Sequence, residues 1–397
     1  MQITYPWVMI PRTLSSTLLS RTAMYPVLTL TGPRQSGKTT LCRMMFPGKP
    51  YISLEALDSR DFALTDPRAF LAQVRDGAVL DEVQRVPGLL SYIQEEVDRD
   101  PRPGRFILTG SENLALNQGV SQSLAGRTGI LHLLPCSREE VSAFPGFPKK
   151  LWPALWHGGY PRVFDQHIPP DIWFADYLAT YVERDVRQLL RVSDLRSFTA
   201  FLRLAAGRTG QELNLSALAS DVGTAVNTIK AWISVLEASY LVILVPAWHT
   251  NARKQVVKAP KLHFLDSGLA CHLLGIRDAG QLALHPLRGA IFESWVVSEI
   301  VKSRSNQGLS PECFHYRETR GPEVDLMVRG PKGWHLVEAK SAQTLDEEFF
   351  HHLHNLKERL GEKAVAEMRL VFGGESSVKR SGVEVVSWRG LQKADWA

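Results

Sequence analysis

Cysteine is scarce in this chain of 397 residues, which contains only four. They are scattered and form no C-x-x-C pair: Cys42, Cys136, Cys271 and Cys313. Cysteine-rich zinc sites and disulfide frameworks both need thiols at recognisable spacings, so this pattern argues against either. Scattered single cysteines fit a reducing compartment, and we expect a cytoplasmic location.

Long apolar runs are also missing. A membrane-spanning helix needs ~20 apolar residues in succession, and no stretch of this sequence approaches that length. The opening stretch, MQITYPWVMIPRTLSSTLLSR, has no basic start followed by an uninterrupted apolar core, and Pro6 and Pro11 break it. We therefore expect neither a signal peptide nor a membrane segment.

Charge of one sign is not in large excess. The net charge of +5 is compatible with nucleic-acid binding but too small to establish it. The chain is long for a single hydrophobic core, and a stretch rich in Pro, Gly and Trp begins at Pro145. We expect three domains, over residues 1–145, 146–255 and 256–397.

The strongest motif present lies near the N-terminus. In YPVLTLTGPRQSGKTTLCRMMF an apolar strand, a glycine-bearing loop and a helix start follow one another, and the loop matches G-x-x-x-x-G-K-[ST]. Such a loop turns its backbone N–H groups toward phosphate oxygens at a helix N-terminus. We expect Lys38 to neutralise the β and γ phosphates of ATP and Thr39 to ligate Mg²⁺. The predicted nucleotide-binding residues are Gly32, Pro33, Arg34, Gln35, Ser36, Gly37, Lys38, Thr39 and Thr40.

Two further apolar runs end in polar groups. GAVLDEVQRV predicts a buried strand that ends at Asp81 and Glu82, where Asp81 would hold the metal and Glu82 would orient the attacking water. RFILTGSEN predicts a strand that ends in Thr109 and Ser111. Because ligands of an open α/β sheet bind at the carboxyl ends of its strands, we expect these groups to meet at one crevice. An ordinary helix cap or turn is the alternative for Thr109.

These segments, together with SLAGRTGILHLLPCSREE, resemble prokaryotic AAA+-type P-loop ATPases of a two-part family whose C-terminal half was long assigned no function. The resemblance spans nearly the whole chain and implies an α/β fold with a P-loop parallel sheet. It implies that Thr109 and Ser111 sense the γ-phosphate. It also implies that Arg127 stabilises charge, either within its subunit or in a neighbour's site, which would make the protein a homo-oligomer. A surface or strand-anchoring arginine is the alternative.

The middle of the chain predicts a helical region with a winged helix. In LNLSALASDVGTAVNTIKAWISVLEASYLVILVPAW two short helices flank Gly223, and an apolar strand follows. The start of the second helix could contact DNA through Thr224, Asn227, Thr228 and Lys230. A basic wing could grip phosphates through Arg253, Lys254, Lys258 and Lys261. A lid or a protein contact is the alternative role.

The last region predicts a small α/β domain. Glu293 lies on the apolar stripe of a helix, and a Gly/Pro turn joins two alternating runs into an antiparallel hairpin that carries Asp325, Glu338 and Lys340. This set is similar to the PD-(D/E)xK restriction-endonuclease-like fold, in which carboxylates bind Mg²⁺ and a lysine polarises water. Val324 replaces the namesake proline. A Glu338–Lys340 pair on an exposed strand is the alternative.

Three functions fit these features. The first is an ATP-hydrolysing AAA+-type machine that binds DNA, such as branched or broken duplex, through the winged helix and the C-terminal domain. The second is an ATP-gated, Mg²⁺-dependent DNA nuclease. The third is a signalling switch in which ATP controls assembly and the C-terminal domains bind proteins. We expect the first.

Overall fold

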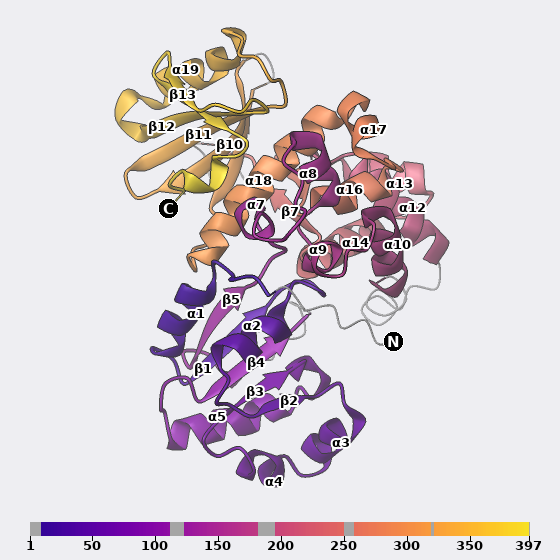
Figure 1. Cartoon of the computed structure of the whole chain (residues 1–397), viewed down its shortest axis with the longest axis vertical. Coiled ribbons are helices and arrows are strands. Elements are labelled where there is room, and N and C mark those ends of the chain that lie inside the picture. Colours follow the sequence, from indigo (N-terminus) through magenta and orange to yellow (C-terminus); the bar gives the residue numbers. More distant parts are fainter. Residues whose placement is uncertain (1–8, 112–122, 182–194, 250–257, 319–320, 397) are drawn as a thin grey trace.

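The computed structural model describes residues 9–111, 123–181, 195–249, 258–318 and 321–396. Figure 1 shows a parallel-sheet region that contains β1 to β5, a helical region beside it and a second sheet that contains β9 to β14. The α/β class predicted from the sequence is confirmed. None of the described helices is long and apolar enough to cross a membrane.

The first region is built on a five-stranded parallel sheet in the order β2-β3-β4-β1-β5. Every residue of β1, β3 and β4 is buried, because helices cover both faces. The strands are β1 (Val27–Thr31), β2 (Tyr51–Ser53), β3 (Ala78–Asp81), β4 (Phe106–Gly110) and β5 (Thr128–His132).

Two layers of helices sandwich this sheet. The side chains of α1 and α2 share a core with Leu28 and Leu30 of β1, whereas those of α3, α4 and α5 share another with Leu80 and Leu108. The helices are α1 (Ser15–Thr22), α2 (Lys38–Met45), α3 (Leu57–Thr65), α4 (Pro67–Ala72) and α5 (Leu89–Arg99).

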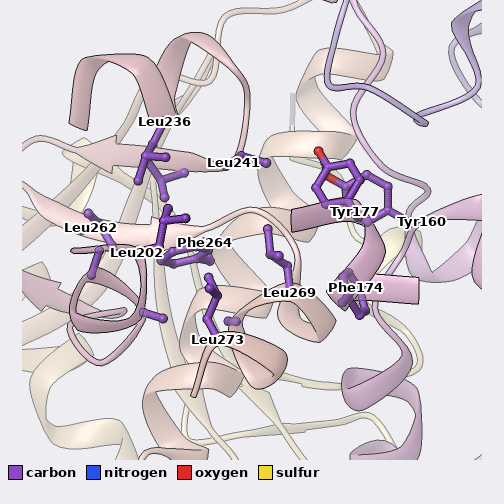
Figure 2. Close-up of a cluster of buried hydrophobic side chains, with 14 of the residues drawn as sticks. Tyr160, Phe174, Tyr177, Leu202, Leu236, Leu241, Leu262, Phe264, Leu269 and Leu273 are labelled. Atoms are coloured by element: carbon purple, nitrogen blue, oxygen red, sulfur yellow. The ribbon is translucent and has the colours of Figure 1, made fainter. Parts of the chain in front are cut away.

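The helical region surrounds a large aromatic and aliphatic core, part of which Figure 2 shows around Tyr160, Phe174 and Tyr177. Its helices are α7 (Arg138–Val141), α8 (Leu151–His157), α9 (Pro161–Asp165), α10 (Pro170–Tyr181), α12 (Leu195–Ala206), α13 (Leu215–Val222), α14 (Val226–Ala238), α16 (Ser267–Leu273) and α17 (Ala279–Leu284). Gly223 takes the left-handed conformation between α13 and α14, with φ of 75°, as a tight helix–helix turn requires.

A three-stranded sheet in the order β6-β8-β7 accompanies α13 and α14. Its strands are β6 (Gln211–Glu212), β7 (Val242–Val245) and β8 (Lys261–Phe264), and all the pairs are antiparallel. The predicted boundary between residues 255 and 256 is therefore misplaced. β8 lies beyond that boundary, yet it pairs with two strands that precede it.

The C-terminal region has a six-stranded mixed sheet in the order β13-β14-β12-β11-β10-β9. The helix α18 (Arg288–Asn306) packs on one face, and α19 (Glu348–Leu360) packs on the other. The strands are β9 (Cys313–Arg317), β10 (Glu323–Gly330), β11 (Gly333–Lys340), β12 (Val365–Phe372), β13 (Val378–Arg380) and β14 (Val383–Ser387).

The predicted hairpin is confirmed, because β10 and β11 pair antiparallel around a short turn. The apolar residues of β10 do not all share one face, however. The register of β10 against β9 shifts between Val324 and Met327, and Val324 packs under α19 while Leu326 and Val328 pack on α18.

Candidate nucleotide site and charged clusters

The loop between β1 and α2 has the backbone that its glycines predict. Gln35 and Gly37 adopt positive φ angles of 64° and 96°, and such alternation turns successive N–H groups toward one point. Gly32 has a φ of 152°, and a Cβ there would lie 2.1 Å from the carbonyl oxygen of Leu133. Only glycine fits at this position, because the loop passes directly over the backbone that follows β5.

The Lys38 side chain is folded into this loop and is 6% exposed. Its Nζ donates hydrogen bonds to the carbonyl oxygens of Gly32 and Pro33, at 2.8 and 2.9 Å. Burial lowers the pKa of Lys38 to about 8 and outweighs the opposing effect of the nearby Glu82 and Asp81 carboxylates. A bound phosphate group would give the Lys38 ammonium a negatively charged hydrogen-bond partner in place of these neutral carbonyl oxygens.

Asp81 is the centre of a hydrogen-bond network at the carboxyl end of β3. Its Oδ2 accepts from Thr39 Oγ1 at 3.2 Å and from the Tyr51 hydroxyl, and its Oδ1 accepts from the Thr109 hydroxyl. The structure thus places Thr39, Asp81 and Thr109 together. Thr109 lies inside β4, so the helix-cap alternative is wrong. Sequence reasoning missed Tyr51, whose strand β2 carries no motif.

Glu82 lies next to this network in the left-handed conformation, with φ of 57°. Its Oε2 accepts a hydrogen bond from Ser111 Oγ at 3.0 Å and another from the Gln84 side-chain amide. The strand ends of β3 and β4 thus hold the second predicted carboxylate, as the parallel topology requires. Gln84 also donates to Ser111, at 3.3 Å, and sequence reasoning missed its role.

A pocket of about 410 Å³ opens over the loop. One wall comes from the parallel-sheet region and another from the segment that carries Phe144 and α9 of the helical region. Tyr160, which is buried in the aromatic core of Figure 2, precedes α9 and anchors it. No motif in the sequence indicated that the helical region would contribute to this pocket. Its lining includes Arg12, Arg34, Gln35, Gly37, Lys38, Thr39, Thr40, Glu82, Phe144, Pro161, Arg162 and Asp165.

These residues fit a nucleoside triphosphate and Mg²⁺. The Thr39 hydroxyl and the Asp81 carboxylate, 3.2 Å apart, are both hard oxygen ligands of the kind that Mg²⁺ prefers. The loop amides and Lys38 supply the positive charge that phosphates need. Pro33 and Ser36 are parts of the same loop, and Ser36 is fully buried.

Arg127 lies at the opposite end of the sheet. It precedes β5, whose first residue, Thr128, pairs with Val27 at the start of β1, whereas the loop follows the end of β1. Its guanidinium donates to the Asp98 carboxylate on α5, at 2.5 and 2.9 Å. This position does not fit the alternative in which Arg127 acts within its own subunit. Action on a neighbouring subunit stays a prediction, and so does the alternative of a surface or strand-anchoring arginine, which the contact with Asp98 fits.

The candidate DNA-binding residues differ in their exposure to solvent. Asn227 and Lys230 are exposed near the start of α14, and Thr224 and Thr228 are half-buried. Lys258 is also exposed. Arg253 and Lys254 lie outside the described residues.

Lys261 is not part of a basic wing, and that prediction is wrong. It is 2% exposed in β8, and its Nζ reaches into the acidic cluster predicted for the C-terminal region. It lies 3.0 Å from Glu293 Oε1, 3.1 Å from Glu323 Oε1 and 3.8 Å from Asp325 Oδ1. These carboxylates hold the ammonium charged and raise the pKa of Lys261, although burial opposes this.

The hairpin brings the other predicted residues to the same place. Lys340 Nζ lies 2.5 Å from Glu338 Oε1, and Asp325 Oδ2 accepts from the amide of Ala339 at 2.9 Å. Glu338 is 3% exposed, so the alternative of an exposed Glu338–Lys340 pair is wrong. Burial, reinforced by Asp325, raises the pKa of both Glu338 and Glu293 to about 8.

The predicted carboxylates lie in one cluster, but their side chains are not placed together as metal ligands. Within the described ranges, no three His, Cys, Asp or Glu side chains are arranged to hold a metal ion. Lys261 and Lys340 instead lie among Glu293, Asp325 and Glu338 as the nearest cations. The sequence missed Lys261 here because it comes from β8, in another region of the chain.

Comparison with protein families identifies a known domain in the first region of the chain. The family described as AAA domain matches residues 24–142, and two families described as domains of unknown function, DUF8612 and DUF4143, match residues 148–280 and 288–391. Two solved structures show looser likeness, each at 15% identity. The Walker-type ATPase PABY2304 of Pyrococcus abyssi has a TM-score of 0.43 over 67% of this chain and 99% of its own. AMPPCP-bound DnaA from Aquifex aeolicus has a TM-score of 0.27 over 56% and 85%.

The sequence relatives are closer. The uncharacterised protein Rv2008c of Mycobacterium tuberculosis is 32% identical over 308 residues, which cover 76% of this chain and 67% of that protein. The uncharacterised protein Mb2031c of Mycobacterium bovis matches with the same values. This chain therefore belongs to the family of Rv2008c, and its first region has the AAA-type ATPase fold.

Proposed function

We propose that this protein hydrolyses ATP with Mg²⁺. The observation that carries the proposal is the convergence of Lys38, Thr39 and Asp81 at the carboxyl ends of the parallel strands β1 and β3, which flank β4, beside a pocket that a nucleotide would fill. Mg²⁺, when bound, neutralises charge on the phosphates.

Residues of the chain bind the phosphates, orient the attacking water and hold the Asp81 carboxylate in place. The Lys38 ammonium exchanges the carbonyl oxygens of Gly32 and Pro33 for phosphate oxygens, and it stabilises the negative charge that shifts toward the β and γ phosphates during transfer. Glu82 accepts a hydrogen bond from the attacking water and orients it. Thr109 is buried against Asp81, and its hydrogen bond holds that carboxylate in one orientation.

The direct test is phosphate release by the purified chain, measured with and without Mg²⁺. Duplex, single-stranded and branched DNA are then added in turn, and the DNA is inspected for nicks in Mg²⁺ and Mn²⁺. Hydrolysis stimulated by one of these DNAs supports an ATPase that works on DNA. Hydrolysis that ignores every DNA favours the signalling switch.

The proposal extends to DNA binding through α14. Helices α12, α13 and α14 with the sheet β6-β8-β7 have the element order of a winged helix, and the start of α14 presents Asn227 and Lys230 to solvent. An amide and an ammonium there suit a base edge and a phosphate. Branched or broken duplex stays the expected substrate.

We propose that the C-terminal region binds DNA, with cleavage as the alternative. Lys261 and Lys340 lie among Glu293, Asp325 and Glu338, and a bound Mg²⁺ would compete with these lysines for the carboxylates. Nicks that require Lys340 would instead favour the ATP-gated nuclease.

Self-association is part of the proposal because Arg127 is half-buried at the end of the sheet remote from its own nucleotide pocket. If Arg127 stabilises charge at a nucleotide site, that site belongs to another subunit. Sedimentation of the purified chain with and without ATP tests this, and a monomer under both conditions would contradict it.

A further inference from the structure

Arg12 is a buried cation that the proposed reaction has not used. It precedes α1, lies outside every motif, and is 8% exposed. Its guanidinium lines the nucleotide pocket, and a Cβ at Gly37 would lie 3.6 Å from its Nη1. A buried arginine is costly unless several groups accept its protons.

One of those groups is the phosphate-binding loop itself. Arg12 Nη1 donates to the carbonyl oxygen of Ser36 at 2.6 Å. A loop that turns its N–H groups inward must turn carbonyl oxygens outward, and those oxygens need donors. Lys38 donates to the carbonyl oxygens of Gly32 and Pro33, but bound phosphates would attract Lys38 away from them. Arg12 lies outside the loop, so its hydrogen bond to the carbonyl oxygen of Ser36 can remain.

The other two nitrogens of the guanidinium contact residues that follow β5 in the sequence. Nη2 donates to the carbonyl oxygen of Leu134 at 2.8 Å, just beyond β5, and Nε lies 3.1 Å from Glu140 Oε1. Glu140 also accepts from the amides of Thr13 at 2.7 Å and Ser137 at 2.8 Å. Burial alone would raise the pKa of Glu140, but Arg12 and these amides lower it, so the carboxylate stays ionised.

We propose that Arg12 is a positioning residue for nucleotide binding, which holds the phosphate loop in its binding conformation before ATP arrives. The inference rests on the proposed ATPase function. Arg12 contacts the loop and not Asp81 or Glu82, so its removal should weaken ATP binding more than it slows turnover. We expect Arg12→Gln to raise Kd and KM for ATP roughly tenfold or more, with kcat changed by less than about threefold.

Arg105 provides a matched control. It is also buried in the first region, at 5% exposure, and donates to backbone carbonyl oxygens of Arg75 at 3.0 Å and Glu96 at 2.6 Å. It precedes β4, at the end of the sheet away from the loop. Arg105→Gln should lower the melting temperature as Arg12→Gln does, yet leave ATP affinity unchanged. Arg12→Lys keeps the charge but offers a single donor nitrogen in place of the guanidinium's three, so it should restore part of the affinity.

The experiment is calorimetric titration of ATP and steady-state turnover for the wild type and these three variants, with melting temperatures in parallel. Loss of affinity in Arg12→Gln, partial rescue in Arg12→Lys and retention in Arg105→Gln support the inference. Unchanged affinity in Arg12→Gln, or equal losses in both glutamine variants, overturns it. A wild type that binds no ATP sinks the proposed function instead, and so the two failures are distinct.

Discussion

The hydroxyl of Thr39 lies 3.2 Å from Oδ2 of Asp81, although 42 positions of sequence separate the two residues. Thr39 belongs to the first turn of α2, and Asp81 ends β3. In the strand order β3-β4-β1, this contact passes the end of β4, where Thr109 donates to the other oxygen of the same carboxylate. The three strand ends therefore form one site.

Substitutions of Lys38 and Glu82 should affect ATP binding and ATP hydrolysis differently. Lys38→Ala removes the ammonium that faces the phosphates, so ATP binding and hydrolysis should both be lost. Glu82→Gln keeps the loop intact but removes the carboxylate that orients water, so hydrolysis should fall at least ~100-fold while ATP still binds. Lys49→Ala is the control, since Lys49 donates to the carbonyl oxygen of Arg105, away from the loop. Normal hydrolysis by Glu82→Gln would exclude its assigned role.

Tyr51→Phe should lower the apparent affinity for Mg²⁺ in ATP hydrolysis. The phenol donates to Asp81 Oδ2, the oxygen that also faces Thr39, and such outer contacts orient a metal-binding carboxylate. We expect the Mg²⁺ concentration for half-maximal ATP hydrolysis to rise about tenfold. Tyr25→Phe, a change just before β1, is the control. A magnesium dependence identical to that of the wild type would show that Tyr51 only packs.

Glu338→Gln should flatten the pH dependence of stability. Burial raises the pKa of Glu338 from 4.5 to about 8, so between these pH values the folded chain holds a proton that the unfolded chain releases. The free energy of unfolding therefore falls as pH rises through this window. The glutamine variant lacks this loss, and its melting temperature should drop less between about pH 5 and pH 8. Glu358→Gln, an exposed change on α19, should follow the wild type.

Lys230→Ala should weaken DNA binding most at low salt, and should make the binding less dependent on salt. An exposed lysine on a phosphate adds about one unit to the slope of log affinity against log salt concentration, so the variant should lose about one unit. Fluorescence anisotropy with labelled duplex at several salt concentrations measures the slope. Lys150→Ala, an exposed change just before α8, is the control. Equal slopes in all three proteins would remove α14 from the interface.

Arg127 can be tested by mixing two inactive chains. Arg127→Ala should bind ATP normally, since Arg127 lies at the other end of the sheet, but should hydrolyse it slowly. Mixed with Lys38→Ala, it should regain part of the wild-type turnover, because the Lys38→Ala chain supplies Arg127 to an intact neighbouring pocket. A mixture no more active than its components would leave Arg127 as the surface partner of Asp98.

The local elements of this protein follow from the sequence alone. The strand, loop and helix around Lys38, the acidic end of β3, the turn at Gly223 and the hairpin of β10 and β11 were all predicted, because each depends on residues within a few positions. Apolar runs and glycines set these local conformations directly, so the nucleotide loop and the carboxylates beside it could be named.

Only the tertiary structure decided which distant residues join them. Tyr51 and Arg12 carry no motif, Lys261 was predicted on a surface wing but is buried among carboxylates, and Arg127 lies at the wrong end of the sheet for its own pocket. Strand order and direction control these outcomes. Those are properties of long-range pairing, and a side chain gives no local sign of the partner that burial will bring to it.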